Sequence, residues 1–199
     1  MIGVAHKFAV WLMQQGAIDD EDLELYEYAG YCILLTVLPL TLAFCIGLCF
    51  GMAVESVLML LPFIVTRKFS GGYHLRSATV CMIVSVILIT LFSLGVRFLI
   101  PYIGYDILTL LVCMAFILIC VLSPIDSEER QLSDKEKCAF KKIAIIASAC
   151  FLFLYGILIW TKSFQFASPI GMGILLTCIL QLPCIPHIIK AKLKRRTTV

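Results

Sequence analysis

Long apolar runs separated by short polar connectors dominate this chain. A helix needs about 20 predominantly apolar residues to cross a bilayer. The run over 31–66 is therefore long enough for two helices. We expect them to separate near Gly51–Glu55, because a carboxylate is tolerated at a turn and costly at mid-bilayer. The pattern predicts about six transmembrane helices, or fewer if part of 31–66 is re-entrant; the remaining runs cover 78–96, 107–123, 143–161 and 169–189.

The first 28 residues follow a different pattern. Residues 1–15 are too polar to span, but they can place several apolar residues on one helical face, namely Ile2, Ala5, Phe8, Ala9 and Leu12. This predicts an amphipathic helix that lies in the membrane interface or packs on the bundle. An acidic run follows, so a secretory signal is not expected. We expect one membrane-embedded domain over 1–199, with an N-terminal segment (1–28), a transmembrane bundle (31–189) and a basic tail (190–199).

Composition and charge sharpen this picture. The chain has 199 residues, of which 61% are hydrophobic and 15% charged, whereas a soluble domain is about half apolar and about a quarter charged. The fold class is therefore an all-α, polytopic membrane helical bundle. With six spans and both termini in the cytoplasm, 14 of the 16 Lys and Arg residues lie inside, and Arg97 and Lys162 lie outside. This asymmetry favours that orientation in the cell membrane.

Ten cysteines are spread over the chain, most of them inside apolar runs. There they behave as small hydrophobic residues, and no Cys-x-x-Cys or zinc-type spacing occurs. We therefore expect free thiols, with no metal, no cofactor and no nucleic-acid partner.

Residues 67–81 are the exception, because basic residues, paired glycines, His74 and Cys81 converge there. A cysteine becomes nucleophilic when a histidine, positive charge or a helix N-terminus favours its thiolate. His74 is a candidate base, Arg67 lies nearby, and Ser77 is a candidate N-cap that places Cys81 about one turn into a helix. The alternative is a purely structural role, in which the histidine lies in the membrane interface, the cysteine is buried and the arginines are ordinary anchors.

The spacing constrains the chemistry. On one continuous helix, His74 and Cys81 would lie about 10 Å apart along the axis, which is too far for proton transfer. The chain before Ser77 must therefore leave the helix, and Gly71 and Gly72 give the backbone this freedom. Free N–H groups at the helix start could then bind an oxyanion. A His/Cys dyad is expected, with Asp126 as a candidate third member.

At these residues the chain resembles the AgrB (accessory gene regulator B) membrane peptidases of Gram-positive bacteria. The resemblance rests on Arg67, Gly71-Gly72, His74 and Cys81 in this order and spacing. It extends to Glu27-Tyr28 and to the Ser-Pro-x-Asp stretch at Ser123–Asp126, which lysines follow.

The resemblance implies that the chain processes a small AgrD-like precursor peptide in quorum sensing. The cysteine matching Cys81 would release the C-terminal tail and form a thioester, from which a cyclic thiolactone or lactone arises. The histidine matching His74 would act as base, and the residues matching Arg67 and Gly72 would support the site. Lysines after the fourth span also matter in the family, and the candidates here are Lys135, Lys137, Lys141 and Lys142.

Two other classes of function compete with a peptidase. A small transporter or channel subunit would carry ionisable groups in the middle of its spans, and the centres of these runs hold none. An assembly protein would use the Gly-x-x-x-Gly motif at Gly47 and Gly51, which is equally compatible with a homodimeric enzyme.

Overall fold

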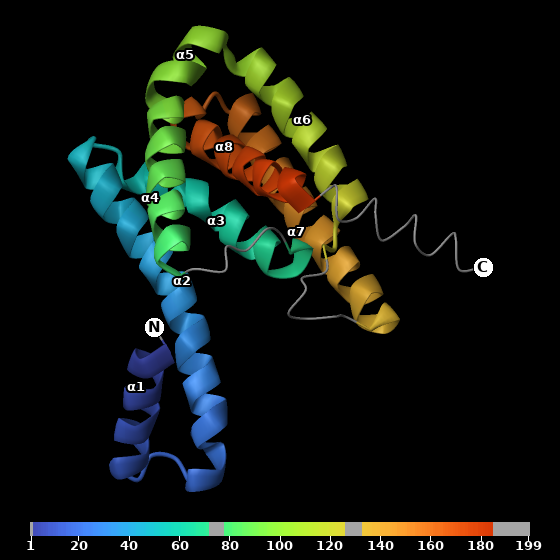
Figure 1. The fold of residues 1–199 in the computed structure, drawn as a ribbon. Helices are drawn as coiled ribbons and strands as arrows, with labels where there is room; N and C mark the ends of the chain where they lie inside the picture. Colours follow the sequence, from blue (N-terminus) through green and yellow to red (C-terminus); the bar gives the residue numbers. More distant parts are fainter. Residues whose placement is uncertain (1, 72–77, 126–132, 185–199) are drawn as a thin grey trace. The chain divides into compact units, whose positions relative to one another are not determined.

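The fold is that of a computed structural model, which describes residues 2–71, 78–125 and 133–184 (Figure 1). These residues form helices and turns without a strand, which confirms the all-α class. The elements are α1 (Ile2–Gln14), the 3-10 turn η1 (Asp20–Asp22), α2 (Leu23–Cys49), α3 (Ala53–Ser70), α4 (Ala78–Leu94), the π-helical segment η2 (Gly95–Leu99), α5 (Ile100–Ile103), α6 (Tyr105–Leu122), α7 (Asp134–Trp160), α8 (Phe164–Gln181) and the 3-10 turn η3 (Leu182–Cys184).

Five helical segments among the described residues are long and apolar enough to cross a membrane, which agrees with a multi-pass membrane protein. The second helix expected within 31–66 is α3, and it is not one of the five. It carries Glu55 in its first turn and Arg67 and Lys68 in its last. The five candidate spans are Asp20–Cys49, Ile83–Ile103, Tyr105–Leu122, Lys135–Trp160 and Phe164–Cys184.

The contacts of the chain group into two units, Met1–Leu42 and Ala43–Val199, with α2 continuing from the first into the second. The division that the sequence predicts, at 28–31 and 189–190, stays a prediction. Residues 190–199 lie outside the described part of the chain.

In the first unit, α1 packs against α2 through small residues. Ala5 and Ala9 are buried, and a side chain at Gly30 would meet Ala5 at ordinary contact distance, 3.7 Å. The imidazole of His6 lies 2.9 Å from the Glu27 carboxylate. Phe8 stacks on Trp11 with ring centroids 6.0 Å apart, and both side chains stay exposed. The helix therefore has a packed alanine face and an exposed aromatic face, and the latter suits a membrane interface.

In the second unit, Gly47 and Gly51 build the turn between α2 and α3. Gly51 has φ +67°, a conformation that favours glycine. A Cβ at Gly47 would lie 2.7 Å from both Met52 O and Ala53 Cα. The close approach expected of this motif occurs here within the chain, at Gly47, and the possible homodimer stays a prediction.

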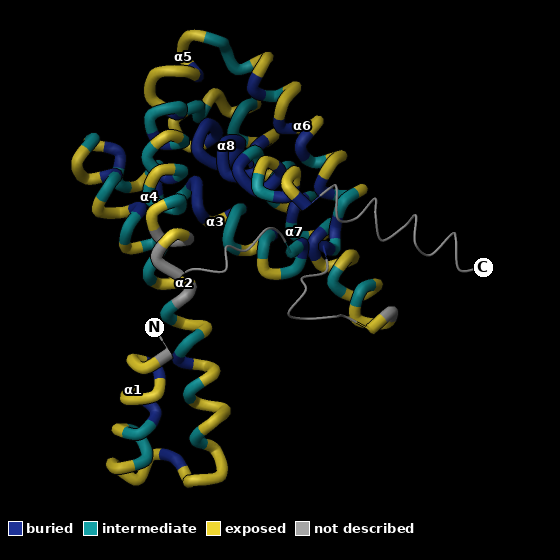
Figure 2. The backbone as a smooth tube through the Cα atoms, viewed as in Figure 1, coloured by how far each residue is buried: buried dark blue, intermediate teal, exposed yellow. Residues whose placement is uncertain are grey.

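The buried helix α8 is the centre of the second unit, where α3, α6 and α7 pack around it (Figure 2). Its glycines permit this close packing. A Cβ at Gly171 would lie 2.9 Å from the Tyr155 ring of α7 and 3.1 Å from Val112 of α6. A Cβ at Gly173 would collide with the Met59 carbonyl oxygen of α3.

Contacts at both ends show that α3, α6 and α8 run in the same direction. At their N-terminal ends, Glu55 accepts a hydrogen bond from Gln165, 2.8 Å, and Tyr105 stacks on Phe164. At their C-terminal ends, Ile125, just after α6, donates to the Ser70 carbonyl, 2.9 Å. An 18-residue helix is about 27 Å long. α3 therefore extends along the bundle as far as the apolar α6 does.

The helices α4 and α7 run the opposite way. Ser93 near the end of α4 lies 3.0 Å from Ser56 near the start of α3, oxygen to oxygen, and both side chains are buried. Tyr155 near the end of α7 lies 2.9 Å from Thr109 near the start of α6. In each pair the two hydroxyl groups are hydrogen-bonded to each other, which matters because lipid offers no hydrogen-bond partner. The pairs also fix the register of neighbouring helices.

Candidate functional site

Several of the predicted site residues lie outside the described part of the chain: Gly72, His74, Ser77 and Asp126. Cys81 is the fourth residue of α4, and its side chain is likewise not described. α3 ends at Ser70 and Gly71 after it is not helical, so the chain leaves α3 before His74, as the spacing predicts. The structure describes α4 from Ala78 onward, and the predicted start of this helix at Ser77 stays a prediction.

The sequence predicts that Cys81 lies about one turn after the start of α4, and the described part of this helix begins at Ala78. The first turn of a helix has backbone N–H groups without intrahelical partners and carries a partial positive charge. A cysteine at a helix N-terminus has a lowered pKa for this reason.

Gly71 is the point where α3 meets the chain that follows α6. Its N–H donates to the Arg67 carbonyl, 3.1 Å, and its φ of +72° with ψ −165° is accessible almost only to glycine. A Cβ at Gly71 would collide with the carbonyl oxygen of Ile125. Ile125 in turn donates its N–H to Ser70. Glycine is therefore required here both by conformation and by space.

Arg67 is half-buried in the last turn of α3. Its guanidinium lies over the Phe63 ring, 5.2 Å from the centroid, a favourable cation–π contact. It also lies close enough to the Cys184 thiol, at the end of η3, to act on it electrostatically. Arg67 thus places a positive charge where the ends of α3 and α8 meet.

The end of α8 supplies a residue that sequence reasoning missed. Gln181 is 1% exposed, and its Nε2 donates to the Ser123 hydroxyl at 3.4 Å. Ser123 follows α6 and is also buried. One signal was available in the sequence, since Gln181 is the only carboxamide in the apolar run 169–189. We refer to the region formed by Arg67–Gly71, Ser123–Ile125 and Gln181–Cys184 as the Gly71 end of the bundle.

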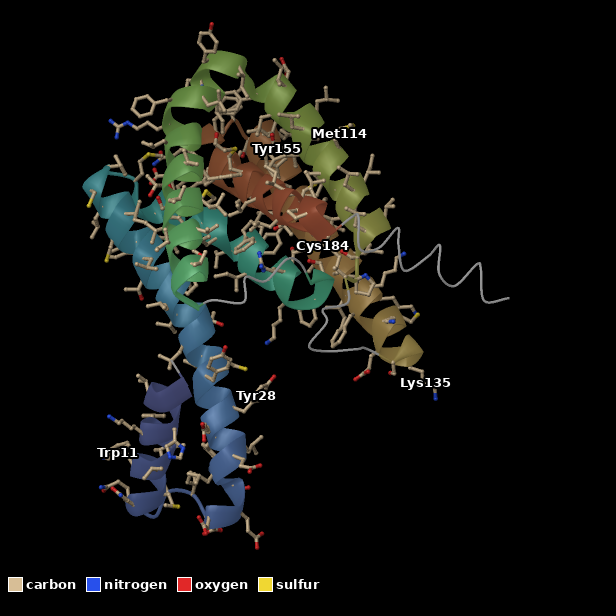
Figure 3. The ribbon with its side chains drawn as sticks, viewed as in Figure 1. Trp11, Tyr28, Met114, Lys135, Tyr155 and Cys184 are labelled. Carbon is tan, nitrogen blue, oxygen red and sulfur yellow. The ribbon has the colours of Figure 1, made fainter. Side chains whose placement is uncertain are left out.

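The four candidate lysines lie on α7. The helix begins at Asp134, because Ser133 and Glu136 form a capping box: the Ser133 N–H donates to Glu136 at 2.9 Å and the Glu136 N–H donates to Ser133 at 3.3 Å. The polar residues between the apolar runs that end at 123 and begin at 143 are therefore helical from 134 onward. Figure 3 shows Lys135 at the N-terminal tip of α7 and Cys184 in η3, just after the end of α8.

Helical spacing separates these lysines into two pairs. Lys137 and Lys141 are four residues apart and share a face, and Lys135 and Lys142 are seven apart and share another. Phe140 packs on Phe69 of α3, with ring centroids 6.1 Å apart, and so shows which side faces the bundle. Lys141 acts electrostatically on Cys120 of α6. The pair of Lys137 and Lys141 therefore lies nearer to the Gly71 end.

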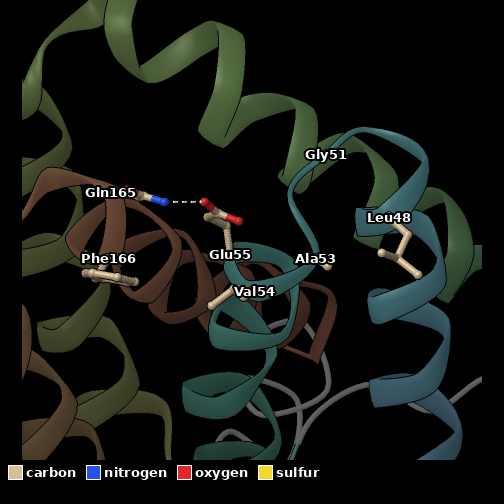
Figure 4. A pocket seen from close by; sticks show the side chains of 7 residues that line it. All are labelled: Leu48, Gly51, Ala53, Val54, Glu55, Gln165 and Phe166. Carbon is tan, nitrogen blue, oxygen red and sulfur yellow. Dashed lines mark hydrogen bonds between the residues drawn. The ribbon is translucent and has the colours of Figure 1, made fainter.

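Two open hollows lie elsewhere in the second unit. One has a volume of about 480 Å³ and lies at the N-terminal ends of α3 and α8, around Glu55 and Gln165 (Figure 4). Because Glu55 is twelve residues from Arg67, it is about 18 Å away along α3. The other, about 620 Å³, is lined by apolar residues of α6 and α7 and offers no reactive group. Neither belongs to the candidate site.

Comparison with known proteins identifies the family. The family model for accessory gene regulator B matches residues 5–182. A putative AgrB-like protein of Clostridium perfringens (strain SM101 / Type A) is 25% identical over 146 residues, which cover 68% of this chain and 66% of that protein. The putative AgrB-like protein 2 of Clostridium perfringens (strain 13 / Type A) is 24% identical over 170 residues, with coverages of 79% and 78%. No solved structure matches.

The matched region contains residues 67–81, the described part of the Gly71 end up to Leu182, and the four lysines of α7. The chain therefore belongs to the AgrB (accessory gene regulator B) family of membrane proteins, a membership that implies a role in the processing of quorum-sensing peptides.

Proposed function

We propose that this protein is a membrane cysteine endopeptidase that cuts the C-terminal tail from a small AgrD-like precursor peptide and retains the rest as a thioester. The observation that carries the proposal is the family match over residues 5–182, which includes His74 and Cys81 at the spacing of the resemblance. The end of α3 at Ser70 supports it, because the chain leaves that helix at Gly71, before His74, as the spacing of the two residues requires.

In the proposed reaction, His74 takes the proton of Cys81, and the thiolate sulfur attacks the carbonyl carbon at the cleavage point. The tetrahedral oxyanion would be stabilised by N–H groups at the start of α4. The C–N bond then breaks, and the departing amine of the tail receives the proton from His74. The product on the protein is an acyl thioester of Cys81.

Ring closure follows without an external energy source. A cysteine or serine side chain of the bound peptide attacks the thioester carbonyl, and the Cys81 sulfur leaves as thiolate and recovers a proton. A thiolactone or lactone ring results. Exclusion of water decides between cyclisation and hydrolysis, and a site at the edge of the bilayer favours cyclisation.

We also propose that the Gly71 end faces the cytoplasm, with both termini on that side. Arg67, Lys68 and the lysines of α7 lie near this end, whereas Glu55 and Asp106 stand in the first turns of α3 and α6 at the other end. Such a charge distribution follows the positive-inside rule. No charged residue stands in the middle of α3, α4, α6 or α8, which disfavours a transporter.

The test is tail release from the precursor in proteoliposomes, followed by mass spectrometry. The wild-type protein should release the tail and give a species sensitive to hydroxylamine, and Cys81→Ala should give neither product. Cys150→Ala, an exposed cysteine of α7, serves as the matched control and should retain wild-type cleavage. Full tail release by Cys81→Ala would falsify the proposal.

A further inference from the structure

The buried carboxamide of Gln181 is only partly hydrogen-bonded. Its Nε2 donates to Ser123, but its Oε1 is enclosed and has no hydrogen-bond partner among the described residues. A buried acceptor without a partner is unfavourable for folding. An apolar side chain of similar size would avoid this penalty. The buried polar residues Ser168 and Thr177 of α8 bond carbonyl groups of their own helix, whereas the Oε1 of Gln181 has no such partner in the described part of the chain, so stability alone does not account for glutamine here.

The partner of Gln181 is connected to the candidate site by a short path. Ser123 is two residues before Ile125, and Ile125 donates its N–H to Ser70 at 2.9 Å. The Ile125 carbonyl lies where a Cβ of Gly71 would be. Residues 72–77, which include His74, continue directly from Gly71, and Asp126 follows Ile125 in the sequence.

We propose that Gln181 is a positioning residue for the peptidase site. It holds Ser123, and through Ser123–Ile125 it fixes the end of α3 from which the segment carrying His74 continues. The proposal rests on the proposed function and adds to it a residue that acts through another residue and does not touch the peptide. A small displacement of reacting groups lowers the rate of an enzyme without weakening substrate binding.

The experiment is a double-mutant cycle on tail release in proteoliposomes, with Gln181→Met, Ser123→Ala and the double variant. If Gln181 acts through Ser123, each single change should lower kcat by about tenfold or more while KM stays within about twofold. The double variant should be no slower than the slower single variant, because both changes break one connection. The melting temperature of Gln181→Met should stay close to that of the wild type, because removal of the unpaired Oε1 offsets the loss of the hydrogen bond to Ser123.

Gln165→Met is the matched control. Gln165 is the second residue of the same helix and bonds Glu55 at the opposite end of α3. This change should leave kcat and KM at wild-type values.

Three results would overturn the inference. They are wild-type kcat in Gln181→Met, a fall in melting temperature that parallels the fall in activity, and multiplication of the two single effects in the double variant. Cys81→Ala separates this inference from the proposed function. If Cys81→Ala cleaves, the peptidase itself is wrong; if it is inactive while Gln181→Met is fully active, only the role of Gln181 is wrong.

Discussion

At the scale of single residues, Gly71 is the most constrained position next to the candidate site. Two independent requirements meet there, a backbone conformation that L-residues avoid and the carbonyl of Ile125 in the place of a side chain. The conformation follows from the need to end α3 abruptly, and the contact follows from the hydrogen bond between Ile125 and Ser70.

The substitution Gly71→Ala should therefore be more harmful than conformation alone explains. A non-glycine residue in this region costs about 1–3 kcal/mol, and displacement of Ile125 adds to it. Gly104→Ala is the matched control, because Gly104 has the similar angles φ +85° and ψ 159° but no atom within 4 Å of its Cβ position. We expect a lower melting temperature in detergent for Gly71→Ala than for Gly104→Ala, and loss of tail cleavage only in the former. Equal destabilisation with retained cleavage in both would contradict the contact with Ile125.

At the scale of elements, α7 changes how its lysines are interpreted. The capping box of Ser133 and Glu136 starts the helix early, so the lysines are fixed on a rigid element. Side chains on a helix differ by face, and only one face can approach the Gly71 end. The sequence does not tell which of the four lysines serves the candidate site, and the helix reduces this choice to one between two pairs.

The double substitution Lys137→Gln/Lys141→Gln should raise KM for an acidic precursor tail several-fold, because positive charge near a site raises the local concentration of an anionic substrate. Its KM should also depend less on salt than that of the wild type. Lys135→Gln/Lys142→Gln removes the same charge from the other face and should have the smaller effect. Steady-state cleavage at two salt concentrations measures both quantities. A larger effect from Lys135 and Lys142 would show that the other face binds the tail.

At the scale of the whole molecule, α3 is the element that decides the topology. By composition it is not one of the five candidate spans, yet its contacts reach from Gln165 at one end to Ile125 at the other. α3 packs against α8 and α7. Its charged residues stand only in its first and last turns, so none of them would lie in the middle of the bilayer. We therefore propose that α3 is a sixth crossing, with its two ends on opposite sides of the membrane.

Cysteine accessibility tests this topology. Val54→Cys and Tyr102→Cys should react with a membrane-impermeant maleimide in intact cells, because both lie at the proposed outer end. Lys68→Cys and Lys135→Cys should react only after permeabilisation. The four parent side chains are exposed in the structure, so burial in the protein does not explain a lack of labelling. Labelling of Val54→Cys and Lys68→Cys from the same side would mean that α3 does not cross.

The sequence by itself determined the class of fold and the place where α3 ends, and it predicts a reactive stretch after that end. Apolar runs of spanning length require membrane helices, and a glycine pair between two runs requires a break. For this reason the all-α bundle and the end of α3 before Gly72 agree with the structure. The start of α4 at Ser77 stays a prediction, because residues 72–77 lie outside the described part of the chain. These features depend on residues that are neighbours in the chain, so local patterns are sufficient to predict them.

Only the tertiary structure decided which distant residues meet. Gln181 and Ser123 are 58 positions apart, and no periodic pattern relates them. Three other features likewise depend on how helices pack: the close contact of Gly47 with the start of α3, the division of the lysines into two faces, and the central position of α8. Packing energies arise from the shapes of surfaces that are far apart in sequence. A hydropathy pattern records only which surfaces avoid water, and it does not specify which of them come into contact.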